Sequence, residues 1–77
     1  MKHETNTLYY TVEKQTHDVI GFEECTGWKT LTVYTIEHNV PKVMCELEAR
    51  NESSSESEIQ TWLDEEGDEK EYQFVQL

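Results

Sequence analysis

The sequence predicts an α+β fold: a single twisted antiparallel sheet of four to five strands, with one short helix packed on one face. Stretches of β-branched and aromatic residues alternate with polar residues over most of the first 49 positions, as in half-buried strands. One later stretch places apolar residues at helical spacing. The 77 residues suffice for one domain with a thin core, and 35% of them are hydrophobic, which is too many for a disordered acidic tail.

The first predicted strand covers residues 7–12. Leu8 and Tyr10 share one face of it, and Tyr9 lies on the opposite face, where its ring can be exposed. Residues 14–18 are polar, and they predict a break after this strand.

The second predicted strand covers residues 19–25, with Ile20 and Phe22 on a shared face. Gly27 then predicts a tight hairpin turn with Thr26, because glycine accepts the positive φ that a two-residue turn needs. Residues 28–37 form the third strand. Both of its faces carry apolar side chains, as expected of a central strand.

The fourth predicted strand, residues 42–49, follows turn formers at residues 38–41. It alternates regularly between apolar and polar positions. The side chains expected to face the core are Val43, Cys45, Leu47 and Ala49, and those expected to face outward are Lys42, Met44, Glu46 and Glu48.

The helix is predicted to begin at Ser55, which forms a capping box with Glu58. Gly67 is a natural stop for it. Its narrow apolar stripe consists of Ile59, Trp62 and Leu63. Residues 72–77 alternate again and predict a last strand, which gives the order β-β-β-β-α-β in one domain: residues 1–49 form the sheet scaffold, and residues 50–77 form the acidic helix and C-terminal strand.

The negative charge is unevenly distributed along the chain. The net charge is −11; residues 1–45 hold six acidic and four basic side chains, whereas residues 46–77 hold eleven acidic and two basic. Such a balance disfavours direct binding to nucleic acid or to anionic membranes, both of which would repel the protein. It favours a basic partner, although charge that serves solubility alone is the simplest explanation.

No motif in the sequence carries recognisable chemistry, and we expect neither an enzyme nor a cofactor or metal site. None of the three histidines, His3, His17 and His38, has ligand types at metal-binding spacing, so each is expected to be a surface residue. Cys25 and Cys45 fit no redox or metal motif and are expected to be reduced, buried and inert. The acidic stretch at residues 64–69 lacks the ligand spacing of a calcium loop.

The sequence begins without an apolar leader, and no stretch approaches the roughly 18 apolar residues of a membrane span. A cytoplasmic location is therefore expected. A homodimer remains open, because a domain this small gains stability from pairing.

The favoured functional hypothesis is a non-catalytic inhibitor that mimics the charge of nucleic acid and occupies the basic surface of a nucleic-acid-handling protein. The rise of about 1.5 Å per residue in a helix is close to the roughly 1.7 Å per charge of duplex DNA. Small phage-type counter-defence proteins have comparable size and charge, but this likeness rests on no shared sequence motif. The residues expected to contact the partner are Glu46, Glu48, Glu56, Glu58, Asp64, Glu65, Glu66, Asp68, Glu69, Glu71, Trp28 and Tyr9.

The alternative is a protein-binding adaptor or regulatory subunit that uses an apolar sheet surface or a sheet edge. Its candidate contacts are Tyr9, Trp28 and Met44, and the charge would then serve only solubility.

Overall fold

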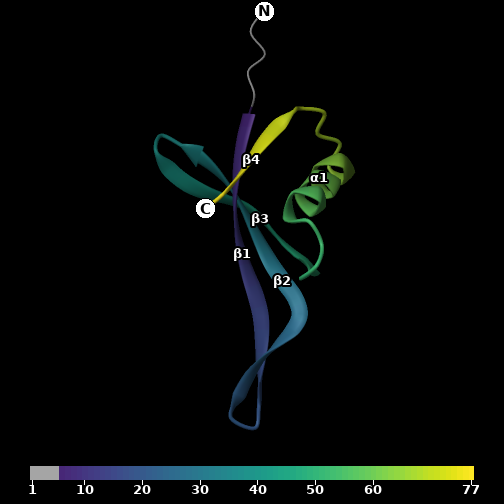
Figure 1. The fold of residues 1–77 in the computed structure, drawn as a ribbon. Coiled ribbons are helices and arrows are strands. Elements are labelled where there is room, and N and C mark those ends of the chain that lie inside the picture. The colour runs from purple at the N-terminus through teal and green to yellow at the C-terminus, as the bar shows by residue number, and fades with distance from the viewer. Residues whose placement is uncertain (1–5) are drawn as a thin grey trace, which may run out of the picture.

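The computed structural model describes residues 6–77, which form one four-stranded sheet with one helix on one face (Figure 1). The elements follow the chain as β1 (Asn6–Val19), β2 (Phe22–Glu37), β3 (Val40–Arg50), α1 (Ser55–Glu65) and β4 (Tyr72–Gln76). The strands lie side by side in the order β3-β2-β1-β4. The α+β class with a single covering helix is therefore confirmed, and the order is β-β-β-α-β, with one strand fewer before the helix than predicted.

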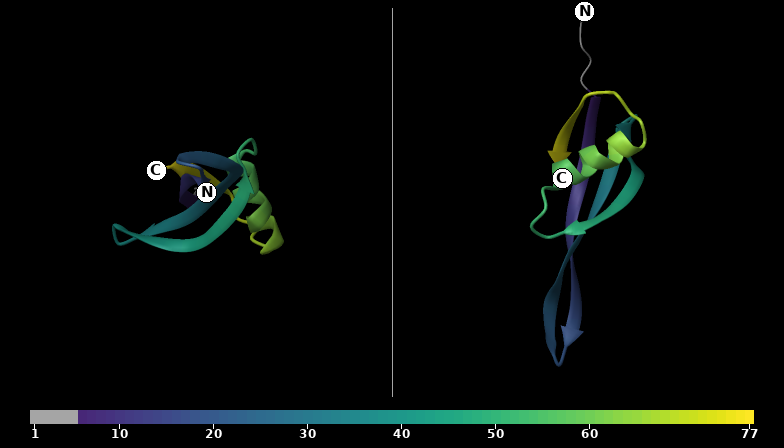
Figure 2. Two further views of the ribbon diagram at one scale, coloured as in Figure 1. Left: turned by 90° about the horizontal axis from the view of Figure 1, so that it is seen from below. Right: turned by 90° about the vertical axis from the view of Figure 1, so that its right-hand side faces the viewer.

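The sheet is mixed, because β4 pairs with β1 in parallel, from the Asn6–Tyr72 pair to the Tyr10–Gln76 pair. The prediction of a wholly antiparallel sheet is wrong for this strand. The other three strands are joined by two-residue hairpins, which reverse the chain and force antiparallel pairing. After β3 the chain instead crosses one face of the sheet through α1 and returns at the far edge beside β1 (Figure 2).

The first hairpin turns at Ile20 and Gly21, where the chain has φ of 42° and 82°, between the paired residues Val19 and Phe22. Positive φ at both central residues marks the type I′ turn, whose twist suits a tight hairpin. The predicted break at residues 14–18 is wrong, because β1 continues to Val19. The predicted second strand is divided between the end of β1 and the start of β2.

Gly27 does adopt a positive φ of 87°, but in a bulge within β2 and not in a turn. Lys14 pairs with Lys29 and Thr16 pairs with Cys25, so three residues of β2 lie opposite the single residue Gln15. The prediction of a turn at Thr26 and Gly27 is therefore wrong, since glycine at positive φ serves a bulge as well as a turn.

The second hairpin turns at His38 and Asn39, as predicted, with φ of 52° and 64°. A bulge then changes the alternation of β3: Cys45 pairs with Val33, but Val43 pairs with Tyr34. The extra residue moves Val43 to the face opposite α1, where it is 55% exposed. The prediction that Val43 faces the core is wrong for this reason.

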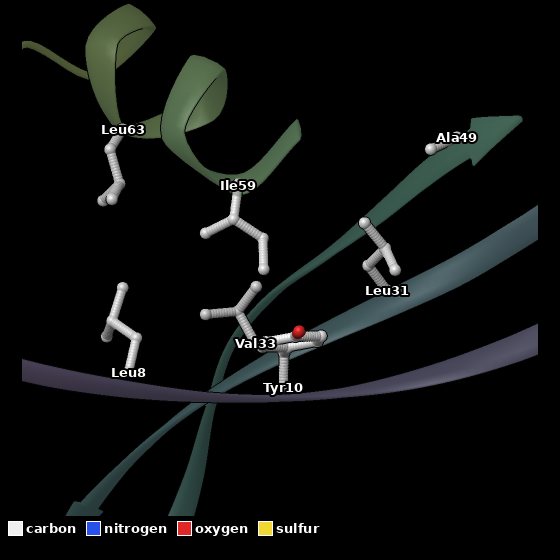
Figure 3. Packing of buried hydrophobic residues seen from close by; sticks show 7 residues of the cluster. All are labelled: Leu8, Tyr10, Leu31, Val33, Ala49, Ile59 and Leu63. Atoms are coloured by element: carbon white, nitrogen blue, oxygen red, sulfur yellow. The ribbon is translucent and has the colours of Figure 1, made fainter. Parts of the chain in front are cut away.

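The core lies between α1 and the sheet (Figure 3). Ile59 and Leu63 point from the helix toward the strands and are almost wholly buried. The sheet contributes Leu8, Tyr10, Leu31, Val33 and Ala49. Cys45, Leu47 and Trp62 are partly buried against this cluster, so the predicted inward face of β3 is confirmed from Cys45 onward.

Both ends of α1 are capped locally. The N-cap is Ser54, whose Oγ accepts a hydrogen bond of 3.4 Å from the Ser57 amide, so the predicted cap at Ser55 is one residue late. The predicted stop at Gly67 is confirmed, with φ of 76°. The Gly67 amide donates to the Asp64 carbonyl at 3.1 Å and the next amide to the Leu63 carbonyl at 3.0 Å, which is a Schellman motif.

Candidate functional site

The carboxylates of α1 and of the segment that leads to β4 form the first candidate surface. Because Ile59 and Leu63 face the sheet, the acidic side chains are left on the outer sides of the helix. All of them are exposed except Glu58, which is half-buried. We call this set the acidic ridge: Glu56, Glu58, Asp64, Glu65, Glu66, Glu69 and Glu71.

The helical charges of the ridge form two clusters. Glu56 and Glu58 lie in the first turn, and the next carboxylate along the helix is Asp64, about 9 Å further at 1.5 Å per residue. From Glu56 to Glu66 five carboxylates span about 15 Å, or about one per 4 Å. This density is close to the 3.4 Å per phosphate of one DNA strand and about half that of the duplex.

The ridge carries almost no compensating charge. Lys70 is the only Lys or Arg from residue 51 to residue 77, against nine acidic residues. Within residues 6–77 the only Lys, Arg or His nitrogen within 4 Å of a carboxylate oxygen is His17 Nε2, 3.8 Å from Glu24 Oε2 in the first hairpin, and this contact is an ion pair only when the imidazole is protonated. The ridge carboxylates are thus left to repel one another, which disfavours the compact state.

Asp68 has a structural role and is not part of the acidic ridge. Its carboxylate accepts a hydrogen bond of 2.6 Å from the Tyr72 hydroxyl and one of 3.0 Å from the Lys70 amide. The bond from Tyr72 is the main reason why the pKa of Asp68 is lowered, and the same bond raises the pKa of Tyr72. Asp68 therefore fixes the loop between α1 and β4.

Glu46 and Glu48 lie on the other side of the molecule. Their neighbours in β3, Leu47 and Ala49, face the helix, so alternation directs both carboxylates to the uncovered side of the sheet, which we call the open face. Glu48 Oε1 accepts a hydrogen bond of 3.5 Å from Gln15 Nε2 there. One flat partner surface cannot contact these two residues and the ridge together.

The two predicted aromatic contacts also lie apart from the ridge. Trp28 is 41% exposed, and the Arg50 guanidinium lies 5.1 Å from the centre of its ring. Tyr9 is half-buried on the open face. It belongs to a transverse apolar row that crosses all four strands: Val75, Tyr9, Tyr34 and Val43.

Two exposed apolar residues were missed by the sequence reasoning. Ile20 is 95% exposed and Phe22 is 71% exposed, at the turn of the first hairpin. The predicted strand at residues 19–25 placed them on a shared face. The sequence feature that could have revealed this turn is Gly21, because a glycine at this position can form a hairpin turn as readily as Gly27, where the turn was predicted.

The nucleophilic and metal-binding residue types are scattered. Cys25 is exposed, contrary to expectation, whereas Cys45 is partly buried, and burial followed by the charge of Glu66 raises the pKa of its thiol. His17 and His38 are exposed, and His3 lies outside the described residues. No three potential ligands among His, Cys, Asp and Glu gather within residues 6–77.

A depression of about 560 Å³ lies where β1 and β4 begin and β2 ends. Its only charged groups are Glu37 and Lys70, so it is chemically distinct from the acidic ridge. In this described part of the chain, no helix has the length and apolar character needed to cross a membrane.

No protein-family model matches the chain, and neither a curated protein nor a solved structure shows significant similarity to it.

Proposed function

We propose that this protein binds a basic surface on a nucleic-acid-handling protein through the acidic ridge and thereby inhibits that protein. The supporting observation is the cluster of exposed carboxylates on α1 and its C-terminal loop, none of which lies within 4 Å of a Lys or Arg nitrogen among residues 6–77. Self-repulsion at this surface lowers stability, and a basic partner would replace the missing counter-charges.

The mean charge density of the ridge favours a groove that holds a single strand or one strand of a duplex. Averaged over residues 56–66, the two clusters give about one charge per 4 Å, close to the density of one strand. The acidic ridge would then exclude nucleic acid by occupying its binding groove. A phage-type counter-defence inhibitor is the favoured form of this proposal.

A second candidate function is that of an adaptor which binds through the open face. The apolar row of Val75, Tyr9, Tyr34 and Val43 supports it, since α1 covers only the other face of the sheet. Val43 and Val75, at the two ends of the row on the edge strands β3 and β4, are 55% and 42% exposed. In this case the ridge would contribute solubility alone.

Matched charge variants separate the two functions. The ridge variant combines Asp64→Asn, Glu65→Gln and Glu66→Gln. The control variant neutralises three carboxylates of the open face, with the same change in net charge: Glu13→Gln, Glu46→Gln and Glu48→Gln. The binding partners are host proteins that dissociate from the unaltered protein when duplex or single-stranded nucleic acid is added. The affinity of these partners is measured for the unaltered protein and for both variants, at 50 and 500 mM NaCl.

Charge mimicry predicts that the ridge variant loses about tenfold or more in affinity at low salt and that the control stays within about twofold. Affinity that is equal at both salt concentrations and unaffected by the ridge variant would rule out the first function. The adaptor function predicts that result, together with a loss of binding in the variant Tyr34→Ala.

A further inference from the structure

The first hairpin extends beyond the rest of the molecule as a two-stranded arm (Figures 1 and 2). β3 ends where Arg50 pairs with Trp28, so residues 15–27 have no third strand beside them. At about 3.3 Å per residue the six residues of β2 before Trp28 extend the arm by about 20 Å. No residue of the arm is buried, and an isolated two-stranded ribbon has little stability of its own.

The residue at the tip of the arm destabilises the turn in which it lies. Ile20 occupies the first position of the turn at φ of 42°, a conformation in which a β-branched side chain is strongly disfavoured. The second hairpin makes the same kind of turn with His38 and Asn39, residue types that tolerate positive φ. Local structure therefore does not explain an isoleucine at position 20.

Burial does not explain it either. Ile20 is 95% exposed and Phe22 is 71% exposed, and only Val19 beside them is half-buried. The largest side chains at the end of the arm thus face solvent and contribute almost nothing to the core. Strained backbone and exposed apolar surface at one position together indicate a contact residue.

The charges of the arm indicate what it contacts. Asp18 and Glu23 are directly paired across the two strands, and like charges at such positions repel. The arm contains a third carboxylate, Glu24, which lies 3.8 Å from the His17 imidazole, and it contains no Lys or Arg. A cationic group placed beside Asp18 and Glu23 would remove this repulsion.

We propose that the arm inserts its tip, Ile20 and Phe22, into an apolar pocket of a different protein, and that Lys or Arg residues at the rim of the pocket pair with Asp18 and Glu23. This surface is separate from the acidic ridge, and the inference stands without the inhibitory function proposed above. A second copy of this chain is disfavoured by the net charge of −11 that each copy carries. Nucleic acid is disfavoured by the same charge.

The test uses the full chain with p-benzoylphenylalanine in place of Phe22, irradiated in the native host. The polypeptide that becomes crosslinked is identified and purified, and its affinity is measured for the unaltered protein and for two variants. Ile20→Asn creates the favoured Asn-Gly turn and removes the apolar contact. His38→Asn changes the first residue of the other turn and is the matched control.

The expected result has opposite signs for stability and for binding. Ile20→Asn raises Tm by about 2–5 °C or increases hydrogen-exchange protection of the arm amides, yet weakens binding about tenfold or more. His38→Asn leaves the affinity unchanged. Asp18→Asn also weakens binding and reduces its dependence on salt.

Four results would overturn the proposal. A lower Tm in Ile20→Asn would show that Ile20 stabilises the fold. An unchanged affinity of this variant for the crosslinked partner would show that Ile20 is not part of the interface. A crosslink only to a second copy of the chain would make the arm a dimer contact. Binding of the arm to phosphatidylcholine vesicles, lost in Ile20→Asn, would make it a membrane contact.

Discussion

Lys29 is the residue whose replacement most directly tests how the sheet positions α1. It lies on the helix-side face of β2 and is only 6% exposed. Its Nζ donates hydrogen bonds to the carbonyl of Asn51, at 3.4 Å, and to that of Ser53, in the segment between β3 and α1. The Asn51 amide in turn donates to the Gly27 carbonyl at 2.9 Å. Lys29 thus ties the start of the helix to the centre of the sheet.

The substitution Lys29→Met keeps the length of the side chain and removes the ammonium group. Hydrogen bonds from a charged donor contribute about 1.5–3 kcal/mol each, and two are lost. Removing the ammonium also relieves the cost of burying a charge, which offsets part of this loss. We expect the free energy of unfolding to fall by about 2 kcal/mol, a large part of the roughly 3–5 kcal/mol available to a domain of this size.

Urea denaturation followed by tryptophan fluorescence measures this change, since Trp28 and Trp62 lie on either side of the affected segment. With a slope of about 1 kcal/mol per M, the midpoint should fall by about 2 M. Lys42→Met is the matched control: Lys42 is an exposed lysine of β3 that pairs with Thr35, and its loss should change stability by less than about 0.5 kcal/mol. If Lys29→Met is as stable as the unaltered protein, the two hydrogen bonds do not fix α1.

Four further predictions concern the helix, the glycine that ends it, and the hydrogen bond between Asp68 and Tyr72. Leu63→Ala should lower the free energy of unfolding by about 3–4 kcal/mol, because this side chain is 1% exposed. Leu77→Ala, at a site that is 61% exposed, should lower it by less than about 0.5 kcal/mol, and equal urea midpoints for the two variants would contradict the docking of α1. Gly67→Ala should cost about 1 kcal/mol from backbone conformation alone, since φ is +76° and no atom lies within 4 Å of the added methyl group; a larger loss in thermal unfolding would point to a contact. The pKa of Asp68 is lowered in the folded state, so its contribution to stability is present above its usual pKa of about 3.9 and is lost as the pH falls through the lower folded value; Asp68→Asn should flatten that acid limb. The pKa of Tyr72 is raised, so its contribution is present below about pH 10 and lost above it, and Tyr72→Phe should flatten the alkaline limb; unchanged limbs would show that the 2.6 Å bond is not maintained in solution.

The sequence predicted the composition of the core better than the path of the chain. Leu8, Tyr10, Ile59 and Leu63 were assigned to inward faces, and all are buried. Their periodicity depends only on local geometry, which alternation and helical spacing report directly. The helix and its glycine stop were predictable for the same reason.

The position of the first turn was not predictable, because two glycines competed for it. Gly21 and Gly27 both adopt positive φ, one in the turn and the other in a bulge. The residue before Gly21 is isoleucine, which argues against a turn at that position by local preference. A site where local preference and structure disagree is also where a functional constraint is expected.

The position of the charges was predicted along the chain but not in space. The excess charge was assigned to residues 46–71, yet β3 directs Glu46 and Glu48 to the open face and α1 holds the other carboxylates on the opposite side. The bulge at Met44 likewise moved Val43 into the apolar row. Neither effect follows from composition, because each depends on which neighbours a strand pairs with.

The features that reduce stability lie outside the core cluster, on the arm and on the outer sides of α1. The strain at Ile20 and the repulsion between Asp18 and Glu23 act within residues 15–27, where no side chain is buried. The arm can therefore open locally without exposing the core cluster between α1 and the sheet. The ridge repulsion acts on the outer sides of α1, which Ile59 and Leu63 hold in place from beneath. The cost of the arm is therefore local, whereas the ridge repulsion acts on a helix that the core needs, and the contacts of Ile59 and Leu63 with the sheet must outweigh it.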